Sequence, residues 1–234
     1  MKKLGIIGAM QIEVEALIGQ MTQQRCVTKA GMDFYEGELQ GCPVVVVQSG
    51  IGKVNAAICA QLLIDLFSVE LLINTGIAGA LDDRLRIGDI VLAREAMYHD
   101  MQVPNYPVGQ VPGLSIHRFQ ADEQLLTVVE AVSREVLNDI HVYRGRVVSG
   151  DQFICEPQKK QWLRDEVGGT CAEMEGAAIA HVAWKNGIGF LIIRAISDQA
   201  DDQAHIDYPT FEKQAAAHSV ALLSACIPKL DLVQ

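Results

Sequence analysis

The sequence has no long uninterrupted apolar run and no cluster of basic residues. Although 50% of its 234 residues are hydrophobic, no stretch reaches the roughly 18 apolar residues that a membrane-spanning helix needs. The formal net charge is −10, and so acidic a surface repels the phosphate backbone of nucleic acids. We therefore expect no membrane and no nucleic acid among the partners of this chain.

The spacing of a structural metal site is also missing. The cysteines form no C-x-x-C pair, and no histidine stands at ligand spacing from them. Thiols buried in a reducing cytoplasm are the expected state, and we predict no structural zinc. The six cysteines are Cys26, Cys42, Cys59, Cys155, Cys171 and Cys226.

Fingerprints of dinucleotide and nucleoside-triphosphate sites are absent as well. Gly5 and Gly8 are spaced as G-x-x-G rather than G-x-G-x-x-G, and the glycine loop at 49–53 lacks P-loop spacing. Glycine-rich segments nevertheless follow apolar strands near Gly8, at 49–53 and at 75–79. Each is either a tight turn or a place where backbone N–H groups approach one small ligand.

What is present is a regular alternation of apolar strands and helices, without a linker or an internal repeat. The pattern predicts one domain over residues 1–234, with an α/β fold and a central mixed sheet. Turns at Ala30-Gly31 and Gln40-Gly41 predict early antiparallel strands. Three prolines and two glycines predict a long loop over 101–113. Helices are expected at 11–21, 54–67, 122–136 with Asp122 as N-cap, 157–166, 175–186 and 209–227, the last stopped by Pro228.

The segment Phe190–Asp198 is typical of a strand buried on both faces, yet it contains Arg194 in its middle and Asp198 at its end. Burying either charge is costly unless it is paired or used. Ligands of open α/β sheets bind at the C-terminal ends of strands, so Asp198 is a candidate proton donor or acceptor. An internal Arg194–Asp198 ion pair is the alternative.

Three further acids are candidates. Glu13 follows the first strand at the start of a helix, where the helix dipole favours a carboxylate and lowers its pKa. If residues 172–175 are extended, Glu173 and Glu175 share one face and Met174 takes the other. The alternative for Glu13 is an ordinary acid in the first turn of a helix. The alternative for Glu173 and Glu175 is an acidic pair on the surface.

Several short motifs occur in a fixed order along the chain. They are Gly5–Met10 with Glu13, Ser49–Val54, Ile73–Gly76, Gly88–Val91, Tyr98–Asp100, Val148–Asp151 with Phe153, Glu173–Glu175 and Arg194–Asp198. Each is weak alone, but together they are specific. Over nearly its whole length the sequence resembles the bacterial 5′-methylthioadenosine/S-adenosylhomocysteine nucleosidases.

The resemblance implies hydrolysis of the N-glycosidic bond of these two adenosine thioethers, giving adenine and a thioribose, in methionine salvage and the removal of methyltransferase by-products. It also implies a nucleoside-phosphorylase-like fold, a three-layer α/β sandwich with a central mixed, barrel-like sheet. No metal or organic cofactor is implied, and the family forms homodimers. A cytoplasmic location is expected.

The resemblance also implies roles for individual residues. Asp198 would protonate adenine N7 as the bond breaks, Glu13 would deprotonate the attacking water, and Arg194 would help to place that water. Burial should raise the pKa of Asp198, and a neighbouring Arg194 should lower it. The resemblance also implies a set of substrate-binding residues. Glu175 would hold the ribose hydroxyls, Phe153, Ile154 and Ser197 would contact the base, and Met10, Ile51, Met174 and Tyr208 would surround the 5′-alkylthio group. Ala78 and Gly79 would also bind the substrate, and Tyr106 and Pro112 would close the partner subunit's pocket.

The chain departs from the family's pattern in three places. Ile77 stands where the family usually has serine, which removes a polar contact; the helix after Glu175 begins Gly176-Ala-Ala; and the 101–112 loop is shorter.

Two alternative functions stay open. A purine nucleoside phosphorylase would need cationic groups around phosphate, and no extra arginine lies near Gly8 or Ser49. A non-catalytic nucleoside sensor would bind without releasing adenine.

Overall fold

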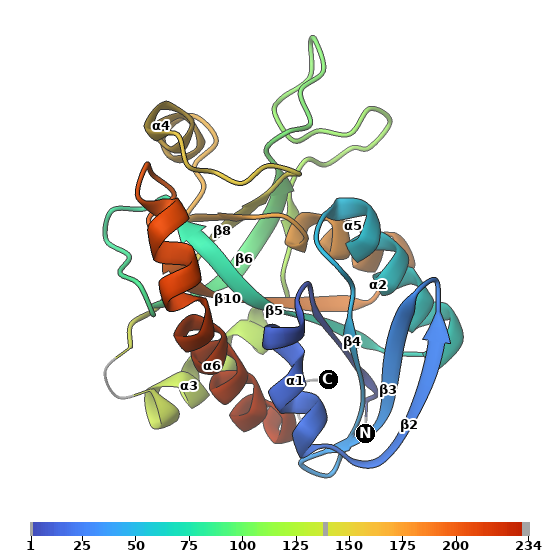
Figure 1. The fold of residues 1–234 in the computed structure, drawn as a ribbon. Coiled ribbons are helices and arrows are strands. Elements are labelled where there is room, and N and C mark those ends of the chain that lie inside the picture. The colour runs from blue at the N-terminus through green and yellow to red at the C-terminus, as the bar shows by residue number, and fades with distance from the viewer. Residues whose placement is uncertain (1, 138–139, 231–234) are drawn as a thin grey trace.

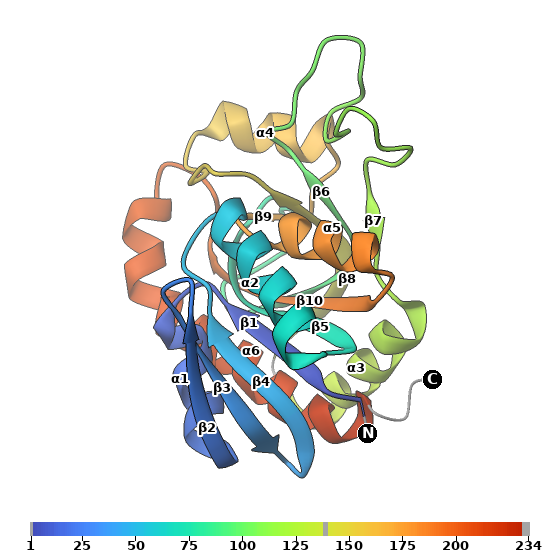
Figure 2. The same cartoon turned by 90° about the vertical axis from the view of Figure 1, so that its right-hand side faces the viewer.

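A computed structural model describes residues 2–137 and 140–230. In this part of the chain, helices pack around a ten-stranded sheet (Figures 1 and 2). The strands are β1 (Leu4–Gly8), β2 (Thr22–Lys29), β3 (Met32–Leu39), β4 (Cys42–Gln48), β5 (Leu71–Ala80), β6 (Ile90–Tyr98), β7 (Phe119–Gln120), β8 (Val142–Ser149), β9 (Cys171–Glu173) and β10 (Gly189–Asp198). The helices are α1 (Gln11–Gln20), α2 (Lys53–Phe67), α3 (Glu123–Val136), α4 (Pro157–Asp165), α5 (Gly176–Asn186) and α6 (Ala204–Leu230).

Five of the strands close into a barrel-like ring. β10 pairs with β5 and β6, β6 with β8, β8 with β9, and β9 with β5. From β5 the sheet continues outward through β1, β4, β3 and β2. Parallel pairs, such as β10 with β5, occur beside antiparallel ones, such as β10 with β6. The predicted mixed, barrel-like sheet is confirmed.

Alternate residues of the inner strands supply two cores, one on each side of the sheet. On β1, Ile6 packs into the core that α1, α3 and α6 cover, whereas Ile7 packs into the core under α2 and α5. Side chains of successive strand residues point to opposite faces, so apolar strands without polar alternation require helices on both sides. The three layers follow from this pattern.

Local signals set several of the element ends. The Asp122 carboxylate accepts hydrogen bonds from the backbone N–H groups of Gln124 and Leu125, at 2.7 and 3.2 Å, and so caps α3 as predicted. Gly187, with a φ of +67°, ends α5 in the left-handed conformation. Residues 99–118 are all described, and none lies in a helix or strand, so the predicted long loop is confirmed. This loop projects from the top of the molecule in Figure 1.

Two expectations about the elements were wrong. The segment 75–79 is not a loop, because β5 continues to Ala80 through its pairing with β10 and β9. Helix α6 begins before Pro209 and continues past Pro228. Each proline removes one N–H donor from the helix, but the buried side chains of Ile227 and Leu230 hold the last turn against the core.

None of the helices within residues 2–137 and 140–230 combines the length and the hydropathy that a membrane span requires. Most of the cysteine thiols are buried, as expected. Cys42, Cys59, Cys171 and Cys226 are buried and Cys155 is half-buried, whereas Cys26 is exposed on β2. The expectation of buried thiols was therefore wrong for Cys26, because β2 lies at the outer end of the sheet, where most of its side chains are exposed.

Candidate active site

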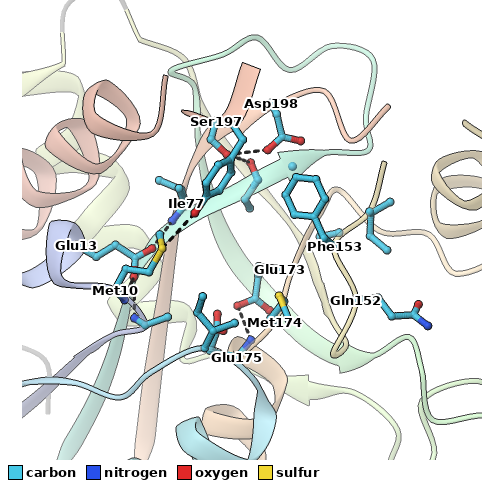
Figure 3. A pocket seen from close by; sticks show the side chains of 17 residues that line it. Met10, Glu13, Ile77, Gln152, Phe153, Glu173, Met174, Glu175, Ser197 and Asp198 are labelled. Carbon is cyan, nitrogen blue, oxygen red and sulfur yellow. Dashed lines mark hydrogen bonds between the residues drawn. The ribbon is translucent and has the colours of Figure 1, made fainter. Parts of the chain in front are cut away.

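A cavity of about 400 Å³ opens where several strands end (Figure 3). Its walls come from residues at or just after the carboxyl ends of β1, β4, β5, β8, β9 and β10, and from α1 and α6. This is the edge at which α/β sheets bind ligands. The lining residues are Ala9, Met10, Glu13, Ile51, Ile77, Ala78, Gly79, Gln152, Phe153, Ile154, Ala172, Glu173, Met174, Glu175, Ser197, Asp198 and Tyr208.

Most of the residues predicted from the sequence meet in this cavity. Those that line it are Met10, Glu13, Ile51, Ala78, Gly79, Phe153, Ile154, Met174, Glu175, Ser197, Asp198 and Tyr208. Sequence reasoning did not place Ala9, Gln152 and Ala172 in the wall; each is a chain neighbour of a candidate residue, and that adjacency was the available signal. Glu173 was a candidate acid without an assigned role, and Ile77 was noted only as a departure from the family's pattern, yet both line the cavity.

Three predicted residues lie outside the wall. Arg194 is only 1% exposed and lies behind the cavity. Tyr106 and Pro112 are exposed on the loop between β6 and β7 and do not line the cavity of their own chain.

Glu13 is held by three backbone N–H groups. Its Oε2 accepts hydrogen bonds from Ala9 and Met10, at 2.7 and 3.0 Å, and its Oε1 accepts one from Ile77 at 3.2 Å. Burial raises the pKa of Glu13, and the charge of Arg194 and the three N–H groups only partly oppose this effect. The lowered pKa expected from the helix dipole was therefore wrong, because desolvation dominates.

Glu173 and Glu175 are both buried, so the surface acidic pair considered for them is excluded. Glu175 Oε1 accepts a hydrogen bond of 2.9 Å from the N–H of Gly52. Burial and the neighbouring Glu173 carboxylate raise the pKa of Glu175 to about 7, against the opposing charge of Arg194. Glu173 Oε2 accepts hydrogen bonds from the N–H groups of Glu175 and Gly176, at 3.1 and 2.7 Å, at the start of α5.

Arg194 pairs with Glu173, and its guanidinium also donates to the side chain of Asn74. Glu175 lies 3.7 Å away. The alternative Arg194–Asp198 ion pair was wrong. Residues four apart on a strand normally share a face, but they are separated by about 13 Å along it, and Arg194 instead meets Glu173 from β9.

Asp198 ends β10 and is 3% exposed. Its carboxylate accepts hydrogen bonds of 2.8 Å from the backbone of Ala200 and from Ser197 Oγ. Burial raises the pKa of Asp198, and the charges of Asp207 and Asp201 raise it further. The expected lowering by Arg194 was wrong, since the arginine charge is directed at the glutamates instead.

The aromatic end of the cavity is formed by Phe153, which is 44% exposed. Its ring centroid lies 5.3 Å from that of His205, and 5.7 Å from that of Tyr208 in an edge-on contact. The Tyr208 hydroxyl donates to Met10 Sδ at 3.1 Å. In the view of Figure 3, Asp198 lies near this ring, and Glu13 and Glu175 lie farther from it.

The charge of the wall has one sign. Of the described residues that line the cavity, Glu13, Glu173, Glu175 and Asp198 are acidic and none is lysine, arginine or histidine. Within the described ranges, no group of three histidine, cysteine, aspartate or glutamate side chains could hold a metal ion. Such a wall suits a ligand that develops positive charge, and it disfavours phosphate.

Residues 3–228 match the phosphorylase superfamily. A 5′-methylthioadenosine/S-adenosylhomocysteine nucleosidase from Exiguobacterium sp. is 39% identical over 98% of this chain and 99% of its own length. The chain belongs to the 5′-methylthioadenosine/S-adenosylhomocysteine nucleosidase family. This confirms the resemblance drawn from the motifs.

Solved structures of the nucleosidase family and of a related hydrolase share the fold. The nucleosidase from Neisseria meningitidis, in complex with methylthio-immucillin-A, is 37% identical, covers 98% of this chain and 100% of its own, and gives a TM-score of 0.94. The futalosine hydrolase of Helicobacter pylori is 29% identical over 97% of this chain and 98% of its own, with a TM-score of 0.92. The predicted nucleoside-phosphorylase-like fold is thereby confirmed.

Proposed function

We propose that this chain hydrolyses the N-glycosidic bond of 5′-methylthioadenosine and S-adenosylhomocysteine, releasing adenine and the corresponding thioribose. The observation that carries the proposal is the set of buried carboxylates around one cavity, three of which have raised pKa values. It is supported by the nucleosidase relative that matches nearly the whole chain. Methionine salvage and the removal of methyltransferase by-products are the processes that such a reaction serves.

Asp198 is proposed as the general acid. Adenine leaves poorly as an anion, so a proton delivered to its N7 makes the bond easier to break. A carboxyl group can deliver that proton near neutral pH only if its pKa is raised, and burial has this effect on Asp198. Ser197, hydrogen-bonded to Asp198, and Ile154 are proposed to contact the edge of the base, and Phe153 to stack on its face.

Glu13 is proposed as the base that orients and deprotonates the attacking water, and Glu175 as the partner of the ribose hydroxyls. The ribosyl group carries positive charge in the transition state of glycosidic hydrolysis, and carboxylates in a water-poor cavity stabilise that charge. Arg194 would act on the water from behind the wall, since its Nη1 and Glu13 Oε1 both pack against Gly76. A Cβ atom at Gly76 would lie 2.7 and 2.5 Å from these two atoms, so only glycine fits there.

The remaining wall is proposed to hold the thioether tail. Met10, Ile51, Met174 and Tyr208 supply its apolar and sulfur contacts, and Ala78 and Gly79 supply backbone close to the sugar and base. A Cβ atom on Gly79 would lie 2.8 Å from Asp198 Oδ1, which explains the glycine there. Ile77 closes the wall with an apolar side chain and still donates its N–H to Glu13.

A homodimer is proposed from the apolar face beside the cavity. Ile51, just before α2, and Val54 and Ile58, in its first two turns, are 52%, 70% and 42% exposed, and a second copy of the chain would bury them. Tyr106 and Pro112 would then reach the partner subunit's cavity. Sedimentation velocity of the protein and of Val54→Glu tests this, and a wild-type protein that stays monomeric would exclude it. Residues 1–234 are proposed to form one domain in the cytoplasm.

The test of the activity is a panel of substrates with adenine release measured for each. Methylthioadenosine and S-adenosylhomocysteine should release adenine at a rate that does not depend on phosphate, whereas 5′-deoxyadenosine and aminodeoxyfutalosine test the preference for the 5′-group. A rate that rises with phosphate and yields ribose 1-phosphate would indicate a phosphorylase. Tight nucleoside binding without adenine release over hours would indicate a sensor. The acidic wall favours neither alternative.

A further inference from the structure

Lys53, Asp100 and Asp151 form a closed ring of contacts just outside the cavity, and we call them the Lys53 cluster. Lys53 Nζ lies 2.5 Å from Asp100 Oδ2 and 3.7 Å from Asp151 Oδ2. The backbone N–H of Lys53 donates to Asp151 Oδ1 at 2.9 Å, and that of Asp151 donates to Asp100 Oδ2 at 3.0 Å. Every member of the cluster therefore contacts the other two.

The cluster joins three segments that are far apart in the sequence. Lys53 begins α2, Asp100 follows β6, and Asp151 follows β8. Lys53 also lies over the ring of Tyr98, with Nζ 5.5 Å from its centroid. The Lys53 and Asp100 side chains are only 19% and 17% exposed. An ion pair shielded in this way fixes its geometry more firmly than a pair on the open surface.

Two of these segments carry cavity residues directly beside the cluster. Ile51, which lines the cavity, and Gly52, which donates to Glu175, immediately precede Lys53. Gln152 and Phe153, which also line the cavity, immediately follow Asp151. Gly52 has a φ of +98°, and a Cβ atom there would lie 3.1 Å from Asp151 Oδ1. The two loops are therefore fitted closely against one another at this point.

We propose that the Lys53 cluster is a positioning element, which sets the Gly52 amide against Glu175 and, through the same contacts, sets Phe153 over the base. The proposal rests on the proposed function of the cavity. None of the three residues lines the cavity, so they act through Gly52 and Phe153. All three residues lie outside the strands of the central sheet.

The pH dependence of activity offers a readout that a merely structural role would not change. The charged groups that face Glu175 are Glu173 from β9, Glu13 from α1 and Arg194 from β10. Burial is the largest influence and favours the protonated form of Glu175, whereas the Gly52 N–H favours the ionised form. If the cluster is lost and Gly52 moves away, the pKa of Glu175 rises. Glu175 then stays protonated to higher pH. Because its ionised carboxylate is the form that accepts hydrogen bonds from the ribose hydroxyls, the acidic limb of the activity profile moves to higher pH.

The experiment compares Asp151→Ala with Asp151→Asn and with two matched controls. Asp151→Ala removes the acceptor for the Lys53 N–H and leaves the Lys53–Asp100 pair in place, whereas Asp151→Asn keeps an oxygen acceptor. Asp122→Ala removes a carboxylate from the start of α3, far from the cavity, in the same way. Lys53→Met is matched by Lys3→Met, since Lys3 makes a similar half-buried pair with Glu36.

We expect Asp151→Ala and Lys53→Met to lower kcat/KM for methylthioadenosine by about 10-fold to 100-fold, the range that small misplacements cause. Both should move the acidic limb to higher pH and weaken the binding of methylthio-immucillin-A by about tenfold or more, as measured by calorimetry. Asp151→Asn should keep most of the activity, and the two controls should match the wild type.

Wild-type kcat/KM and an unmoved acidic limb in Asp151→Ala would overturn the proposal. So would an equal loss of rate at every pH, since that indicates only a loosened fold. A wild-type protein that releases no adenine counts against the proposed function instead. The binding measurement then decides the positioning role by itself, and unchanged inhibitor affinity in both cluster variants would exclude it.

Discussion

Ser197 Oγ lies 2.8 Å from Asp198 Oδ2, and the two neighbours at the end of β10 share this hydrogen bond inside the protein. The serine hydroxyl stabilises the ionised form of the aspartate, while burial and the charges of Asp207 and Asp201 favour the protonated form. Burial is the largest of these effects, so the pKa of Asp198 is raised. Ser197 therefore moderates the acidity of the proposed proton donor.

The variant Ser197→Ala should raise the pKa of Asp198 further, because it removes a hydrogen bond to the ionised form. The protonated acid then persists to higher pH, and the alkaline limb of the kcat/KM profile should move to higher pH. The rate on the plateau should fall, since the base also loses a contact. Ser133→Ala, which removes a buried hydroxyl from α3, is the control. An alkaline limb that stays in place would separate Ser197 from the ionisation of Asp198.

The variant Asp198→Asn should lower the turnover of methylthioadenosine by at least about 100-fold, the usual contribution of a general acid. Asparagine keeps an oxygen that can accept the Ala200 N–H, so the fold should be retained. Adenine release measures the rate, and circular dichroism checks the fold against Asp122→Asn, a cap that tolerates either residue. A nearly normal turnover would remove Asp198 from the mechanism.

The variant Ile77→Ser tests the apolar residue that stands where the family usually has serine. Its hydroxyl should raise turnover or broaden the range of accepted 5′-groups. The same change removes a side chain that packs in the core, where Ile77 is 8% exposed. We expect a loss of about 2–4 kcal/mol in the free energy of unfolding, as for other large-to-small core substitutions. Kinetics on the substrate panel and urea denaturation measure the two effects.

Ile77→Ala is the matched control, since it opens similar space without adding a hydroxyl. If Ile77→Ala and Ile77→Ser gain activity equally, the added space is responsible. If neither variant changes turnover or substrate range, the side chain at position 77 does not affect the reaction. The backbone N–H of Ile77, which donates to Glu13, is then the contribution of this position to activity.

Local signals were sufficient to predict most of the elements. Alternating apolar strands and helices, the Asp122 cap and the turns at Gly31 and Gly41 act over a few residues, and each produced the element expected from it. The end of β5 was missed because glycine at 76 and 79 suggested a turn. Both glycines instead leave room for side chains from distant strands and helices, such as Glu13 and Asp198.

The pairing of charges could not be predicted from the sequence. Arg194 and Asp198 are close in sequence, yet Arg194 pairs with Glu173, on another strand. Glu175 similarly depends on Gly52, at a separation of 123 residues. Spacing along a strand gives the face of a side chain but not its partner across the sheet. The motif order identified the residues of the cavity, and tertiary contacts set their ionisation.

The variant Glu175→Gln should stabilise the folded protein at alkaline pH while it lowers activity. Burial and Glu173 raise the pKa of Glu175 from 4.5 to about 7. Below pH 4.5 the group is neutral in both the folded and the unfolded state. As the pH rises to 7, the unfolded chain releases the proton first, so the wild type loses stability over this window.

Glutamine stays neutral and still accepts the Gly52 N–H. The variant should therefore unfold at the same urea concentration as the wild type at pH 4, and be more stable by about 1–3 kcal/mol at pH 8. An equal stability difference at both pH values would show that Glu175 ionises normally in the folded protein.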